Sequence, residues 1–186
     1  MSGSFQNVQS IDIVDERAEK NINYKFSLYD GKKLPFKNHS FDVVVLNHVL
    51  EHVHSQKDTL KEIKRVMSAK GICYVAVPNK WAFIEPHFNF PFLSWMPQSL
   101  SDFFVQLTRK DHFYNVKPLS RSKYVRLLQR LFFVTDLTEE VACNINHYED
   151  DKSIAKSLIR YIPKPIIKKV LFFSPSFIFI LQNKEK

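Results

Sequence analysis

The sequence predicts an α/β protein with a mostly parallel sheet and flanking helices. Strand-like apolar runs alternate with connections through the first 79 residues, which is the pattern of strands joined by crossovers. The run FDVVVL at 41–46 is almost continuously β-branched, as is typical of a central parallel strand covered on both faces. With 186 residues and 45% apolar content, the chain is long enough to bury one core, so we expect a single domain over 1–186.

The first part of the chain, 1–79, is predicted to hold most of the sheet. Strands are expected at 8–14, 23–29, 41–46 and 71–77. Apolar residues recur at helical spacing across 57–68, and Gly71 is expected to end that helix.

Residues 80–118 have a different character, and we call them the lid segment. They contain both tryptophans of the chain and are dense in phenylalanine and proline. Proline at this density interrupts regular elements, so we expect a structured lid over a substrate region, with a short helix at 100–107.

The remainder, 119–186, is predicted to supply helices and strands that complete the domain. Ser120 is expected to cap a helix that runs to 131, followed by strands at 132–142 and 177–181. No internal repeat is visible.

The net charge of +8 raises the question of an acidic partner. Much of the excess lies in 152–169, where basic residues share one face of a predicted helix. A solvated face is the simplest interpretation, and peripheral contact with an anionic membrane is the alternative. We expect no nucleic acid partner, because arginine and aromatic residues are not interleaved.

The cysteines and the N-terminus suggest a location. Cys73 and Cys143 lie in separate apolar runs with nothing to mark them as a pair, and the first ten residues lack the pattern of a secretory signal. A cytoplasmic protein is therefore predicted.

Polar residues follow several predicted strands at the point where each ends. Because ligands of such sheets gather at the carboxyl ends of the strands, we expect a binding site there. We expect the following residues to lie along one edge of the sheet: Asp12, Asp30, Asn47 and Asn79.

The stretch DGKKLPFKNHSFDVVVLNHVLEHV, with EIKRVMSAKG and ICYVAVPN after it, resembles the middle of a class I S-adenosylmethionine-dependent methyltransferase of type 11. The resemblance implies a Rossmann-like fold, S-adenosyl-L-methionine as cofactor, and methyl transfer to a small-molecule or lipid-linked acceptor.

The resemblance also implies roles for individual residues. Asp12 takes the place of the acid that binds both ribose hydroxyls, with Asp15 as second choice. Asp30 takes the place of the acid that receives the adenine amino group, and Gly31 allows close backbone approach. A simple Asp-Gly turn is the alternative. Further cofactor contacts are implied at the end of the next strand, by Asn47 and His48, and helix capping is the alternative role for Asn47.

Removal of a proton from the acceptor requires a base where the acceptor is a hydroxyl or an amine. The candidates are His87, His112 and Glu85, all in the lid segment. Each is also compatible with a purely structural role.

The pentad His48-Val-Leu-Glu51-His52 has the spacing of a zinc peptidase helix. Such a site needs one uninterrupted helix and a third ligand. The polar run after Ser55 predicts a break, and Glu139 or Glu140, the available third ligands, fall in a predicted strand. We therefore expect no metal here.

The chain departs from the family pattern at its start, because the glycine-rich loop D-x-G-x-G-x-G and the central strand before it have no counterpart. We favour a truncated gene product or an incorrect start. Residues 8–14 in the first-strand place, or a non-catalytic relative that acts as a binding partner, are the alternatives. Activity of this chain is thus uncertain, and unpaired sheet edges make a homodimer one expected outcome.

Overall fold

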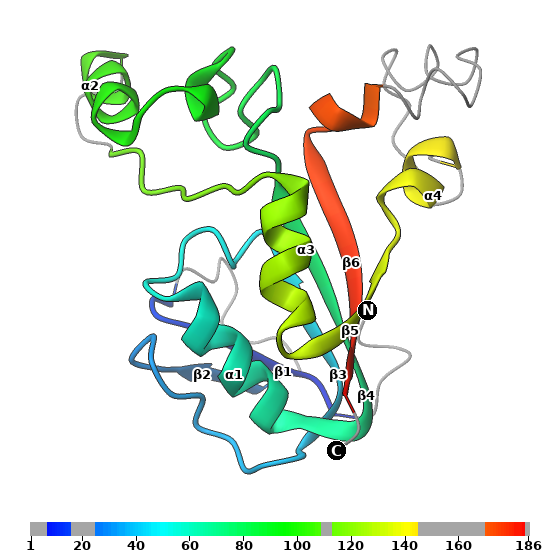
Figure 1. The fold of residues 1–186 in the computed structure, drawn as a ribbon. Coiled ribbons are helices and arrows are strands. Elements are labelled where there is room, and N and C mark those ends of the chain that lie inside the picture. The colour runs from blue at the N-terminus through cyan, green and yellow to red at the C-terminus, as the bar shows by residue number, and fades with distance from the viewer. Residues whose placement is uncertain (1–6, 16–24, 109–112, 145–169, 185–186) are drawn as a thin grey trace.

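The computed structural model describes residues 7–15, 25–108, 113–144 and 170–184. Its main sheet has four strands in the order β3-β4-β6-β5 (Figure 1). The bounds of these strands are β3 Phe41–Asn47, β4 Met67–Pro78, β6 Ser176–Asn183 and β5 Phe132–Asp136. β3 and β4 pair in parallel, and β6 is antiparallel to both β4 and β5. Three of the four strands therefore run in one direction, which confirms the predicted α/β class.

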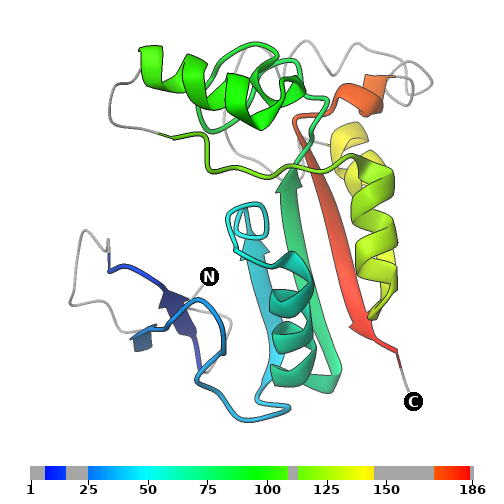
Figure 2. The same ribbon diagram turned by 60° about the vertical axis from the view of Figure 1, so that its left-hand side comes forward.

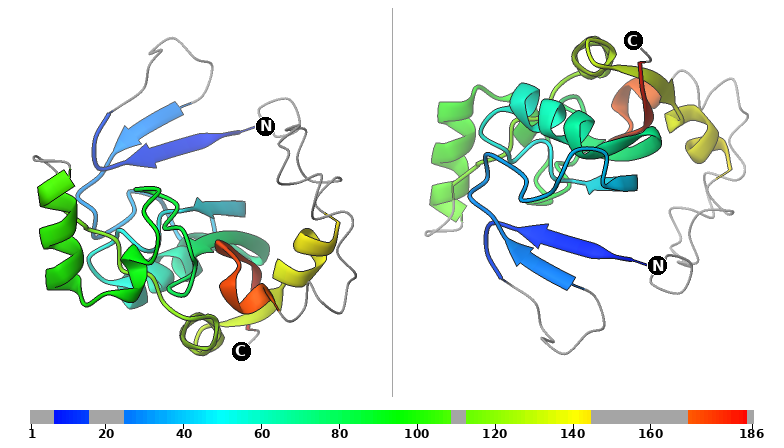
Figure 3. Two further views of the ribbon diagram at one scale, coloured as in Figure 1. Left: turned by 90° about the horizontal axis from the view of Figure 1, so that it is seen from above. Right: turned by 90° about the horizontal axis from the view of Figure 1, so that it is seen from below.

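Strands β1 (Gln9–Asp12) and β2 (Lys25–Leu28) form a separate parallel pair. Figures 2 and 3 show this pair standing apart from the main sheet, on the side of β3. Among the described residues, β3 pairs with β4 alone, and its Val43 and Val45 are exposed. The expectation of a central strand covered on both faces is therefore wrong for β3, which is an edge strand of the main sheet. The two strands that carry Asp12 and lead to Asp30 thus belong to a different sheet from β3.

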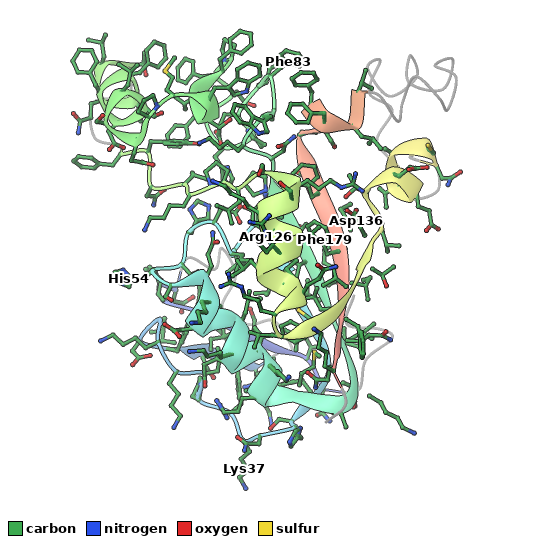
Figure 4. All side chains as sticks on the ribbon, viewed as in Figure 1. Lys37, His54, Phe83, Arg126, Asp136 and Phe179 are labelled. Atoms are coloured by element: carbon green, nitrogen blue, oxygen red, sulfur yellow. The ribbon has the colours of Figure 1, made fainter. Side chains whose placement is uncertain are left out.

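Helices α1 (Gln56–Val66) and α3 (Arg121–Gln129) cover one face of the main sheet (Figure 1). The core between them is aliphatic and aromatic, because alternate residues of β4 and β6 point toward the helices. Figure 4 marks Phe179 of β6, which belongs to this core and is fully buried. None of the helices among the described residues has the length and apolar character needed to cross a bilayer.

The described part of the lid segment lies beyond the carboxyl end of β4 (Figure 2). It contains a 3₁₀ turn, Leu93–Trp95, and helix α2, Gln98–Thr108, close to the predicted 100–107. It has its own small core, centred on Val105 and Tyr114. Phe83, which Figure 4 labels, is half exposed and stacks on Phe173, with ring centroids 4.5 Å apart. That this layer covers a substrate stays a prediction.

Two predicted boundaries are wrong. The strand expected at 132–142 ends at Asp136 and is followed by helix α4, Thr138–Cys143, because the Asp136 carboxylate accepts a hydrogen bond from the backbone N–H of Thr138 and turns the chain. The helix expected at 57–68 ends at Val66, and Gly71 lies inside β4. A Cβ atom on Gly71 would lie 3.1 Å from the carbonyl oxygen of Phe41, so close strand approach explains this glycine. The basic segment 152–169 lies outside the described residues.

The two free cysteines are expected to differ in reactivity. Cys73 is fully buried in β4, and burial raises the pKa of its thiol to about 12, whereas Cys143 is half-buried. In the folded protein, a thiol-specific dye at pH 8 should label Cys143 and should reach Cys73 only after global unfolding. A Cys143→Ser variant isolates the slower reaction. Labelling of Cys73 in that variant without unfolding would contradict the structure.

Candidate functional site

Asp12 and Asp30 follow neighbouring parallel strands. Asp12 ends β1 opposite Leu28, and its carbonyl oxygen accepts a 3.1 Å hydrogen bond from Tyr29 N. Asp30 comes two residues after Leu28, so both carboxylates stand at the same end of the small sheet. The sequence-based expectation that Asn47 and Asn79 share this sheet edge is wrong, because both lie at strand ends of the main sheet.

The Asp-Gly turn, which was the alternative for Asp30, is also formed. The Oδ1 atom of Asp30 accepts hydrogen bonds from the backbone N–H groups of Lys32 and Lys33, at 2.9 and 3.1 Å. These bonds lower the pKa of Asp30. Gly31 has φ +73°, a conformation that side chains disfavour. The turn holds the carboxylate in an ionised, oriented state, which suits a hydrogen-bond acceptor.

Asn47 and His48 end β3 in the main sheet. Asn47 is exposed and caps no described helix, since α1 begins after Ser55, whose hydroxyl accepts from Asp58 N. His48 has φ 54°, and its backbone N–H donates to the carbonyl of Ala76 at 2.9 Å. This left-handed turn directs the chain away from the sheet.

A cluster of three histidines surrounds the carboxylate of Glu51, which is fully buried. Its Oε1 atom lies 3.2 Å from His48 Nδ1, 3.4 Å from His87 Nε2 and 4.0 Å from His52 Nε2. The Nε2 atoms of His52 and His87 are 3.2 Å apart. We call His48, Glu51, His52 and His87 the histidine cluster. It joins the turn after β3 to the lid segment.

Glu85 holds His87 in place from within the lid segment. Its buried carboxylate accepts hydrogen bonds from the backbone N–H groups of His87 and Phe88, at 2.8 and 2.7 Å. Its Oε1 atom also receives the His87 Nδ1–H at 2.8 Å. The imidazole is therefore oriented with Nε2 toward Glu51.

Burial and close charges shift the pKa values of three side chains in the cluster. Glu51 and Glu85 beside it raise the pKa of His87 to about 9, against the effect of burial. Burial alone would raise the pKa of Glu51, but the imidazoles of His48 and His87 outweigh it and lower that pKa to about 2. Burial lowers the pKa of His52. Groups perturbed this far are typical of functional sites, although structural ion pairs produce similar shifts.

The other predicted residues lie away from the histidine cluster or outside the described residues. Asn79 is buried, and its side chain binds the backbone around the start of β6, so it is a structural residue. It borders a surface cavity of about 420 Å³ that Trp81 and Arg121 also line. His112 lies outside the described residues. Glu139 and Glu140 lie in α4 rather than in a strand.

Each member of the cluster stands out in the sequence, but their contact in the folded protein does not. The sequence shows the pentad His48–His52 and separately predicts His87 as a base. His52 and His87 are 35 positions apart in sequence, so no local period links them. The sequence feature that points to His87 is the Glu-Pro-His turn within the aromatic lid segment.

Comparison with solved structures identifies the class of the fold. An S-adenosylmethionine-dependent methyltransferase from Mesorhizobium loti aligns with 95% of this chain and 80% of its own, with a TM-score of 0.56 and 12% identity. A complex between the Haloferax volcanii Trm112 methyltransferase activator and a putative methyltransferase aligns with 96% of this chain and 73% of the other, with a TM-score of 0.55 and 14% identity. This chain shares the Rossmann-like α/β fold of these two structures.

Sequence comparison finds similarity over part of the chain. Residues 5–75 match the family described as "Methyltransferase domain". The uncharacterized protein MJ0638 of Methanocaldococcus jannaschii is 44% identical over 90 residues, which are 45% of this chain and 40% of that protein. A second protein of that organism, MJ1123, is 30% identical over 76 residues. These matches span less than half the length of either relative.

Proposed function

We propose that this chain takes part in methyl transfer from S-adenosyl-L-methionine to a small-molecule or lipid-linked acceptor. The observation that carries the proposal is the position of Asp12 and Asp30 at the ends of adjacent parallel strands, inside the segment that matches the methyltransferase domain family. Carboxylates at such ends suit the hydroxyls and amine of an adenosine group.

In this proposal each residue has a role in cofactor binding or in proton transfer. Asp12 would accept hydrogen bonds from both ribose hydroxyls, and Asp30 from the adenine amino group, while Asn47 and His48 would line the methionine portion. When bound, the cofactor supplies a methyl group on a sulfonium. The chain's own task is to hold the acceptor in line with that methyl group, and His87 is the candidate to receive a proton. A cytoplasmic location belongs to this proposal and is supported by the two free cysteines.

Calorimetric titration of the full chain with S-adenosyl-L-methionine tests the proposal. We expect saturable binding, weakened at least about tenfold by Asp12→Asn, which preserves shape but removes the charge that strengthens hydrogen bonds to hydroxyls. The matched control is Asp58→Asn, which alters an exposed carboxylate on α1 and should leave binding unchanged. Absence of binding up to millimolar ligand would reject the proposal and favour a non-catalytic binding protein.

A further inference from the structure

The buried carboxylate of Glu51 lies at the centre of the histidine cluster. Glu51 is 0% exposed, and neither of its carboxylate oxygens has a hydrogen-bond donor in suitable geometry among the described residues, although three imidazoles surround it. An ionised carboxylate removed from water is costly unless it is hydrogen-bonded or paired with a cation. A cation beside Glu51 meets this need, and either a protonated His87 or a metal ion held by the neutral imidazoles would supply it.

The distances between donor atoms suit a metal ion. Zinc bonds to histidine nitrogen and carboxylate oxygen are about 2.0–2.2 Å, so ligand atoms at the corners of a tetrahedron are about 3.3–3.6 Å apart. The Glu51 Oε1 atom lies 3.2 Å from His48 Nδ1 and 3.4 Å from His87 Nε2, and these three atoms all lie within 4.8 Å of one another. The imidazole of His52 adds a fourth nitrogen, which lies 3.2 Å from His87 Nε2 and 4.0 Å from Glu51 Oε1.

The surroundings of the cluster orient its ligands. The Nδ1–H of His87 donates to Glu85, which leaves Nε2 as the atom that faces the cluster. Histidine ligands of metal ions are commonly held by such a carboxylate, which fixes the tautomer and raises the basicity of the ring. The Nε2 atom of His48 lies 3.4 Å from Ser176 Oγ, so its Nδ1 atom is the one turned to Glu51.

We propose that His48, Glu51, His52 and His87 bind one divalent first-row transition ion of the zinc class. Three imidazoles and one carboxylate favour zinc, cobalt or nickel over magnesium and calcium, which prefer oxygen ligands. The proposal replaces the sequence-based expectation of no metal, because the third ligand is His87 of the lid segment and no uninterrupted helix is required. The ion would fasten the lid segment to the turn after β3.

Metal binding by the full chain tests this proposal. Purified protein is stripped with a chelator, dialysed, and titrated separately with ZnCl₂ and CoCl₂. We expect about one ion per chain by elemental analysis. Cobalt should give the strong visible absorption of a four-coordinate site, and zinc should raise Tm. Less than a tenth of an equivalent after dialysis, with no shift in Tm, would overturn the proposal.

Variants distinguish the cluster from adventitious binding. His87→Gln removes a partly exposed ligand and should weaken zinc binding by at least about 100-fold, while Glu85→Gln should weaken it by about 10–100-fold. His54→Gln is the matched control, since Figure 4 shows His54 on the turn before α1, and it lies outside the cluster. Circular dichroism checks that each variant folds. Equal zinc affinity in His87→Gln and His54→Gln would mean an adventitious ion only and would overturn the assignment.

The metal test stands apart from the methyl-transfer proposal, because zinc and cobalt are titrated without S-adenosyl-L-methionine. Zinc binding without cofactor binding would support the ion site and reject the proposed function. Cofactor binding without zinc binding would do the reverse.

Discussion

Replacement of Arg65 by lysine is expected to lower the free energy of unfolding by about 2–4 kcal/mol. All five N–H groups of the Arg65 guanidinium donate hydrogen bonds. Two go to the carboxylate of Glu62, two to the backbone carbonyls of Leu34 and Phe36, and one to the side chain of Asn38, at 2.7–3.1 Å. Lysine keeps the charge, but its three donors cannot reproduce a planar fork, so part-buried carbonyls lose their partners.

Urea denaturation followed by circular dichroism measures this effect. The matched control is Lys61→Ala on the same helix, which breaks the Asp58–Lys61 ion pair, a pair whose side chains are 65% and 54% exposed. Exposed pairs of this kind contribute about 0.5 kcal/mol or less. If Arg65→Lys and Lys61→Ala had the same effect, the guanidinium would not hold the loop at 34–38 as the structure indicates.

This contact gives a physical reason for a sequence pattern. Glu62 and Arg65 are three positions apart on α1, so they lie side by side, and Glu62 also accepts the backbone N–H of Leu34. The loop LPFKN, which leads into β3, is thereby fixed against the helix that follows β3. The pieces LPF and E-x-x-R of the methyltransferase-like stretch are linked because they form one hydrogen-bonded unit.

The elements that the sequence predicted well are those defined by local chemistry. The β-branched run of β3, the helical spacing of α1 and the apolar strand β6 all appear within a few residues of their expected positions. The error at 132–142 arose because Val141 and Ala142 continue an apolar pattern that is compatible with either a strand or a helix, and the Asp136–Thr138 hydrogen bond decided between them.

The candidate site was predictable only in its separate parts. Asp12 and Asp30 follow strands, so the parallel pairing of β1 and β2 was enough to bring them to one end. The meeting of Glu51 with His87 depends instead on how the lid segment folds back, and Lys117 N, which donates to the Glu51 carbonyl at 2.9 Å, shows the same return from the far end of that segment. Tertiary contacts of this kind leave no period in the sequence.

Replacement of Asn79 by aspartate is expected to destabilise the protein by about 3 kcal/mol or more. The Nδ2 group of this buried side chain donates to the carbonyls of Phe172 and Ser174, at 2.7 and 2.8 Å, and its Oδ1 atom accepts from Trp81 N at 2.9 Å. Aspartate has nearly the same shape, but it would turn an anionic oxygen toward two carbonyl oxygens in a site that is 1% exposed. Asn79→Ala removes the same bonds without that repulsion and should cost less.

Two spectroscopic probes separate local from global effects of this change. Both tryptophans, Trp81 and Trp95, lie in the lid segment with ring centroids 5.7 Å apart, so fluorescence reports on that segment while far-ultraviolet circular dichroism reports on the whole chain. In Asn79→Asp the fluorescence transition should shift to lower urea than the dichroism transition, because Asn79 ties the start of the lid segment to the entry of β6. Asn38→Asp is the matched control, since Asn38 is exposed and acts as an acceptor from Arg65, a role that aspartate keeps. Coincident, unshifted transitions in Asn79→Asp would show that Asn79 does not join these two segments.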